Sequence, residues 1–264
     1  MKIVYACLLA IAAFSCTKII SPKLDSDAGQ LDIEANITDQ YTPQQIFLRA
    51  NTPFSASNQY PAVTNATVTI TDDAGSNYTF TATQPGTYTG PAFSGIAGRT
   101  YRLQVQVDTH QYTATSTMPS LVRLDSLTAR NRPLNRPQSG RDQKVISVYY
   151  HDPSGTPNQY RFIEWVNGAQ VNSVFTYDDQ LTDGRYVTLD LLEQDIDIYA
   201  GDTVRVEMQC IDKPIYTYWF ALVSQQANNF NGAVAPANPP TNIGPQTLGY
   251  FSAHTTQTMT LIVK

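Results

Sequence analysis

The side chains best placed to bind a metal ion are aspartates gathered in two short stretches: Asp178, Asp179 and Asp183 in the first, and Asp195, Asp197 and Asp202 in the second. Oxygen-rich loops of this kind could hold Ca²⁺. Neither stretch follows the calcium-loop spacing of alternate acids, a central glycine and a distal glutamate. Aspartates also make turns and helix N-caps, and we expect that role here, with no metal site.

Short motifs of catalysis are missing from the sequence. The histidines at 110, 151 and 254 are far apart and lie in no metal-ligand spacing, so each is expected in a turn or at the surface. There is no Gly-x-Ser-x-Gly elbow, phosphate loop or dinucleotide fingerprint. Cys210 lies in an alternating run and is expected to be a buried strand residue. We therefore assign no catalytic residue and no cofactor, and expect a protein that is not an enzyme.

A third candidate site combines aromatic side chains with a polar loop. Residues 228–246 are rich in Asn, Pro and Gly, and loops of this length are uncommon unless they bind something. The loop could equally cover a sheet edge, and the aromatic residues around it could be core rather than a carbohydrate or receptor platform. The candidate binding residues are Trp219, Asn238, Asn242, Tyr250 and Phe251.

The first sixteen residues indicate lipid attachment. Lys2 is followed by an apolar run at 3–14, and Ser15 is a small residue before Cys16. A helix of about 12 residues spans about 18 Å, too short for a hydrocarbon core of about 30 Å, so residues 1–15 are expected to be a signal peptide. Cys16 then suits lipoprotein processing, and several acyl chains on it would anchor the protein stably. The alternative is an ordinary signal peptide and a freely secreted protein.

Composition favours exported β-structure behind that anchor. Residues 16–29 are polar and read as a flexible tether, and the rest of the chain is rich in tyrosine and threonine. Charged residues make up 15% of the chain, the formal net charge is -5 and no basic run occurs, which argues against a nucleic-acid partner. With Cys7 removed and Cys16 lipidated, Cys210 has no intrachain partner for a disulfide.

Period-2 alternation of apolar and polar residues dominates from Leu31 onwards. Residues 30–119 hold seven short alternating segments separated by turn signals, which predicts an immunoglobulin-like β-sandwich. A Pro-, Arg- and Asn-rich passage then marks a domain boundary. Residues 120–264 predict a second β-rich domain with one helix near 214–230 and a terminal strand at 256–263. The expected fold is therefore mainly β, with a single helix in the C-terminal half.

Several passages resemble one family of exported lipoproteins typical of Bacteroidota, the domain of unknown function numbered 4249. The similarity is carried by Cys16, the 66–72 strand, Gly98 to Leu103, Tyr112 to Pro119 running into Leu124 to Ser126, Tyr216 to Phe220, Pro239 to Ile243 and Leu248 to Ala253. One departure is Gly244-Pro245-Gln246-Thr247, where the family has a glycine pair. The resemblance implies an exported outer-membrane protein and hints at partnership with TonB-dependent receptors. It transfers no catalytic residue.

These observations predict a lipid-anchored binding or accessory protein of the outer membrane, on its periplasmic or cell-surface face, partnering a TonB-dependent receptor in nutrient uptake. One alternative is a structural or adhesive surface subunit, since tandem sandwiches on a tether make stalks. Another is an exported glycan hydrolase, which requires two carboxylates facing each other across a cleft.

Overall fold

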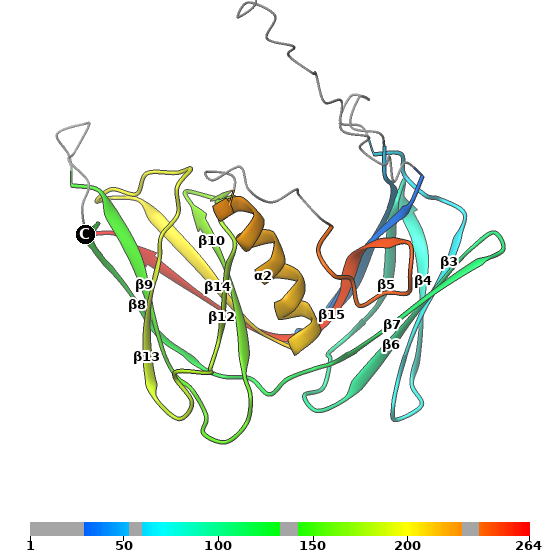
Figure 1. The fold of residues 1–264 in the computed structure, drawn as a ribbon, viewed down its shortest axis with the longest axis horizontal. Helices are drawn as coiled ribbons and strands as arrows, with labels where there is room; N and C mark the ends of the chain where they lie inside the picture. The colour runs from blue at the N-terminus through cyan, green and yellow to red at the C-terminus, as the bar shows by residue number, and fades with distance from the viewer. Residues whose placement is uncertain (1–28, 53–59, 133–141, 229–237) are drawn as a thin grey trace, which may run out of the picture.

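Strands dominate the structure because the alternating segments each bury one face. The computed structural model describes residues 29–52, 60–132, 142–228 and 238–264 (Figure 1). The signal peptide at 1–15, Cys16 and nearly all of the expected tether at 16–29 lie outside these ranges. The described ranges contain helix α2 (Lys213–Asn228) and the strands β1 (Leu31–Thr38), β2 (Thr42–Ala50), β3 (Ala66–Asp72), β4 (Asn77–Gln84), β5 (Thr87–Phe93), β6 (Thr100–Val107), β7 (His110–Thr117), β8 (Leu124–Asn131), β9 (Lys144–His151), β10 (Gln159–Val166), β11 (Ala169–Gln170), β12 (Phe175–Asp178), β13 (Tyr186–Leu191), β14 (Thr203–Ile211) and β15 (Thr247–Ile262).

Seven strands, β1–β7, form most of the N-terminal lobe, and they confirm the N-terminal immunoglobulin-like β-sandwich that the sequence predicted. One sheet contains β1, β2 and β5, and the other contains β3, β6 and β7. β4 belongs to both, because its first half pairs with β3 and its second half with β5. The alternating apolar side chains meet in one core, which includes Ile33, Leu48, Val68 and Leu103.

The C-terminal lobe is a second sandwich. Its three-stranded sheet, β13-β9-β8, faces the sheet that contains β10, β12 and β14. A separate core fills the space between them, with Val148, Phe162, Val206 and Cys210 among its members. Cys210 is 2% exposed on β14, which confirms the expected buried strand residue.

β15 joins the two lobes. Its first half, residues 247–254, pairs in parallel with β1, and its second half, residues 255–262, pairs antiparallel with β14. One continuous sheet therefore passes through both lobes (Figure 1). The sequence predicted only the second half as a terminal strand, because alternation begins there. The C-terminal end of the chain thus contributes a strand to the sheet of the N-terminal lobe. A domain boundary at 119–120 assigns residues 247–254 to the C-terminal domain and leaves out their pairing with β1.

Helix α2 lies between the lobes (Figure 1), within three residues at each end of the range expected for it. Asp212 caps its N-terminus by accepting from the Ile215 N–H at 3.3 Å, and Pro214 occupies its first turn. The same carboxylate accepts from the Ser116 hydroxyl at 2.8 Å and the Thr117 N–H at 3.2 Å, both on β7. The helix start is therefore fixed to the N-terminal lobe.

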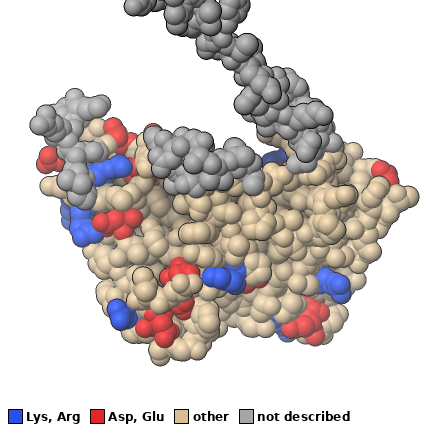
Figure 2. Space-filling model, viewed as in Figure 1, with Lys and Arg blue, Asp and Glu red and all other residues tan. Residues whose placement is uncertain are grey.

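Acidic and basic side chains are interspersed over the face shown in Figure 2, and a broad area of the N-terminal lobe carries neither. The described part of the chain contains no helix that is both long and apolar enough to cross a membrane.

Candidate functional site

A stacked arginine and tryptophan lie where α2 covers the sheet. On β10, alternation sends Tyr160 and Phe162 into the core and Arg161 to the opposite face. The Arg161 guanidinium carbon lies 3.7 Å from the ring centroid of Trp219 on α2, a close cation–π contact. Arg161 Nη1 also donates to Gln209 Oε1 at 3.2 Å. Helix and sheet together therefore fix the position of this cation.

Tyr250 on β15 extends this cluster toward the N-terminal lobe. Its ring centroid lies 5.2 Å from that of Trp219 and 5.0 Å from that of Tyr218. Its hydroxyl donates to Glu34 Oε1 at 3.3 Å and accepts from Asn36 Nδ2 at 3.4 Å, both on β1. The cluster thus connects the helix to strands of both lobes.

A cavity of about 430 Å³ opens beside Arg161 and Trp219. Its other polar wall runs from the end of β11 into the segment before β12, with Gln170, Asn172 and Ser173. Asp195 Oδ2 accepts from the Asn172 backbone N–H at 2.8 Å and from its side chain at 2.9 Å, which holds this segment in place. The volume falls in the range of small-molecule sites.

The electrostatics of the cavity centre on Arg161. Within the described ranges no carboxylate oxygen lies within 4.0 Å of its guanidinium, and the ion pairs found there involve other cations. Burial lowers the pKa of the guanidinium, while Tyr250, Glu207 and Glu34 act in the opposite direction. Burial also raises the pKa of Tyr250, so its hydroxyl is neutral.

The predicted binding residues separate into two groups. Trp219 and Tyr250 meet at the lobe junction, whereas Phe251 is fully buried in the N-terminal core. Asn242 lies against Phe251, accepting from its N–H at 3.0 Å and donating to its carbonyl at 2.7 Å. Asn238 is exposed at the start of the last described range. Of these predicted residues, Trp219 lines the cavity and the other four do not.

Sequence reasoning did not select the polar residues that complete the cavity. Arg161 has one signal, a basic residue facing away from buried aromatics on the same strand. Gln170 and Ser173 carry no such signal, because they approach Trp219 only through the fold.

A second cavity, of about 600 Å³, lies at the end of the N-terminal lobe where the described chain begins. Gly29 and Leu31 form one side of it, and Tyr112, Pro245 and Gln246 contribute to the others.

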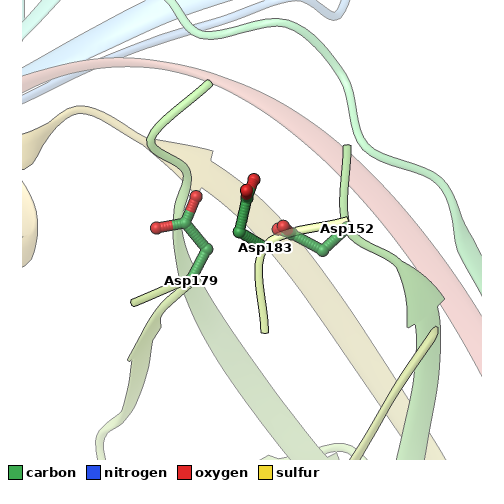
Figure 3. Close-up of side chains that lie close together, drawn as sticks. All are labelled: Asp152, Asp179 and Asp183. Atoms are coloured by element: carbon green, nitrogen blue, oxygen red, sulfur yellow. The ribbon is translucent and has the colours of Figure 1, made fainter. Parts of the chain in front are cut away.

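One aspartate cluster could hold a metal ion, and it differs from the groups suggested by sequence. Asp179 and Asp183 are joined by Asp152 from the end of β9, with one oxygen of each within 4.8 Å of the others (Figure 3). Asp178 instead pairs with Lys213 at 3.6 Å.

Hydrogen bonds give the same cluster a structural role. Backbone N–H groups of Gly155 and Asn158 donate to Asp183 at 2.8 Å and Asp179 at 2.6 Å. Asp152 accepts from the Tyr160 hydroxyl, and burial raises its pKa. The aspartates therefore fasten neighbouring loops together, as expected for turn residues.

His254 contradicts the expectation of a turn or surface position, because it lies within strand β15, in a run of buried residues, and is 2% exposed. Its Nδ1 lies 3.0 Å from the Ser252 hydroxyl, and burial lowers its pKa to about 3. Ser252 is 1% exposed. This serine–histidine contact is sealed from solvent, so it cannot meet a substrate in this conformation. His110 and His151 are exposed, as expected.

Fold and site together define a protein of two joined β-sandwiches, with a cavity of ligand size between helix α2 and the sheet of the C-terminal lobe. A family model described as "Domain of unknown function (DUF4249)" matches residues 17–260. The chain belongs to that family, which confirms the resemblance seen in the sequence. A search of curated proteins finds no match.

Among solved structures, one similar chain is a two fibronectin type-III domain segment from chicken tenascin, with 12% sequence identity and a TM-score of 0.20. The similarity covers 69% of this chain and 90% of that one. This overlap is too low to support an inference about function.

Proposed function

We propose that this protein is a lipid-anchored binding or accessory protein of the outer membrane, attached through Cys16 and partnering a TonB-dependent receptor in nutrient uptake. The observation that carries the binding role is the cavity of about 430 Å³ beside Arg161 and Trp219. Its walls come from β10, the following segment and α2, elements that the sheet and the helix cap hold in place. A site on ordered elements can recognise a ligand without a large rearrangement.

The anchor and the receptor partnership rest on the sequence pattern at 1–16 and on the family resemblance. Affinity purification of the native chain from membranes in mild detergent tests both. We expect recovery of a β-barrel receptor with the wild type. Cys16→Ala should give a folded protein in the soluble fraction that recovers no receptor. Repeated recovery of the wild type alone contradicts the partnership, and membrane retention of Cys16→Ala contradicts the lipid anchor.

A structural or adhesive surface subunit is the second candidate, and β15 is the observation that favours it. Because one strand pairs with β1 in one lobe and β14 in the other, pulling force can pass between the lobes through a continuous sheet. That role predicts surface assemblies visible by electron microscopy on intact cells. It also predicts that they disappear when the gene is deleted.

A further inference from the structure

Arg161 is a partly buried cation that has no close counter-ion in the part of the chain that the structure describes. Buried charges in proteins are normally paired, because removing a charge from water without compensation is costly. Glu34 and Glu207 influence the guanidinium from a distance, but neither forms an ion pair with it. The side chain lines the cavity described above, so a bound anion could supply the missing charge.

The surroundings favour one particular anion. Stacking on Trp219 positions the guanidinium, Gln209 accepts from Nη1, and Tyr250 also forms a hydrogen bond with the arginine. The planar fork carries further N–H donors, and these can bind a carboxylate. Gln170 and Ser173 add polar groups to the wall, and Val171 adds an apolar surface. A small organic acid matches this combination of one fixed cation, polar groups and apolar surface.

We propose that the cavity beside Arg161 and Trp219 binds small organic molecules through a carboxylate group held by the Arg161 guanidinium. The inference rests on the proposed binding function and specifies the class of ligand. Neither the lipid anchor nor the receptor partnership enters the argument, so the two proposals can fail separately.

The chain offers a matched control for Arg161. Arg205 lies with its guanidinium carbon 3.5 Å from the ring centroid of Trp165, its cross-strand partner on β10. Trp165 follows Arg161 by four residues on the same strand and therefore lies on the same face of the sheet. Neither Arg205 nor Trp165 lines the cavity. The two arginine–tryptophan stacks thus differ in their access to the proposed ligand.

Trp219 also provides the signal for the experiment. The chain has two tryptophans, so Trp165→Phe leaves Trp219 as the sole indole fluorophore. In that background we would titrate acetate, succinate, phenylacetate and galacturonate at constant ionic strength. Each would be compared with its neutral counterpart: acetamide, succinamide, phenylacetamide and galactose. We expect at least one carboxylate to change Trp219 emission with an affinity about tenfold or more above that of its counterpart.

Arg161→Gln should weaken binding of that carboxylate about tenfold or more, whereas Arg205→Gln, measured by calorimetry in the native background, should leave it unchanged. Equal binding of acid and neutral counterpart across the panel overturns the proposal, as does full affinity in a folded Arg161→Gln variant. If Arg161→Gln fails to fold, the comparison of acid with neutral ligand on the unsubstituted arginine decides alone. Receptor recovery without carboxylate binding rejects this ligand class and leaves the proposed partnership intact.

Discussion

The side-chain amide of Asn242 forms hydrogen bonds with both backbone groups of Phe251. Asn242 Nδ2 donates to the Phe251 carbonyl oxygen at 2.7 Å, and Asn242 Oδ1 accepts from the Phe251 N–H at 3.0 Å. A neighbouring strand would make the same two hydrogen bonds. Asn242 Nδ2 also lies 3.2 Å from the Thr115 carbonyl oxygen, so one side chain links β15 to β7. It covers backbone groups that would otherwise be left at an open sheet edge.

We expect Asn242→Ala to lower the free energy of unfolding by about 1–3 kcal/mol, because the partly buried N–H and C=O of Phe251 lose their partners. Urea unfolding followed by circular dichroism measures this. Gln111→Ala, an exposed change on β7, is the control and should cost less than about 0.5 kcal/mol. Equal costs for the two variants would mean that water replaces the asparagine without penalty.

Gly249 allows β15 to approach β1. It has a φ of +86°, and an added Cβ would lie 2.1 Å from the Ile33 carbonyl oxygen. Gly249→Ala should therefore cost more than the roughly 1–3 kcal/mol of backbone strain alone. Gly98→Ala isolates that strain, since Gly98 has a φ of +85° and nothing within 4 Å of its Cβ position. Thermal and urea unfolding of both variants should place Gly249→Ala clearly below Gly98→Ala in stability; equal losses would show that β1 shifts freely.

β15 also shows where sequence reasoning reaches its limit. The N-terminal sandwich could be predicted because strands such as β3 alternate, with Val68 and Ile70 buried between partly exposed threonines. Residues 249–255 are buried throughout, since α2 and both lobes surround them, and a strand covered on both faces has no period-2 pattern. Only from Thr256 does alternation return, which is where the terminal strand was predicted.

The candidate site was also predictable from the sequence only in part. Trp219 and Tyr250 stood out by residue type, and their contact follows from one helix packing on one strand. Arg161 and Ser173 reach the cavity only because β10 lies beneath α2, and Asp152 joins Asp179 only through pairing of distant strands. These contacts depend on how distant strands pair and on where the helix packs, which a single sequence does not specify.

Asp212 couples the start of α2 to β7, and this coupling is testable. Asp212→Ala removes the cap on Ile215 and leaves the buried Ser116 hydroxyl without its acceptor, so we expect a loss of about 2–3 kcal/mol. Asp212→Asn keeps an acceptor oxygen and should recover about half of that loss. Hydrogen exchange should show faster opening of α2 in the alanine variant. Unchanged protection of the helix would mean that its packing, rather than the cap, fixes its position.

Glu164 is a carboxyl group inside the C-terminal core. It is fully buried on the same face of β10 as Phe162 and Val166, and within the described ranges neither of its oxygens has a hydrogen-bond partner. Burial, and then Glu193 and Asp195, raise its pKa to about 8. The core therefore favours the protonated form of Glu164 near neutral pH.

The pKa of Glu193 is also raised, to about 7, chiefly by burial and despite Arg132 at 2.9 Å. Both glutamates have pKa values above the ordinary 4.5 for this side chain. At pH values between the unfolded and the folded pKa, the folded protein therefore binds more protons than the unfolded chain does. Their contribution to stability is complete below about pH 4.5 and is lost as the pH rises through about 7 and 8.

Buried His254, whose pKa is lowered to about 3, acts in the opposite direction below its ordinary value of 6.5 and makes the fall shallower there. We therefore expect the melting temperature of the wild type to fall between pH 5 and pH 8, most steeply above pH 6.5. Each coupled proton contributes at most about 1.4 kcal/mol per pH unit. Glu164→Gln should flatten this slope, because the amide fills the same space without titrating. Val166→Ala, on the same face of the same strand, should lower the melting temperature by creating a cavity and leave the slope unchanged. Calorimetry across this pH range measures both effects, and a slope that Glu164→Gln leaves intact would assign the proton uptake to other groups.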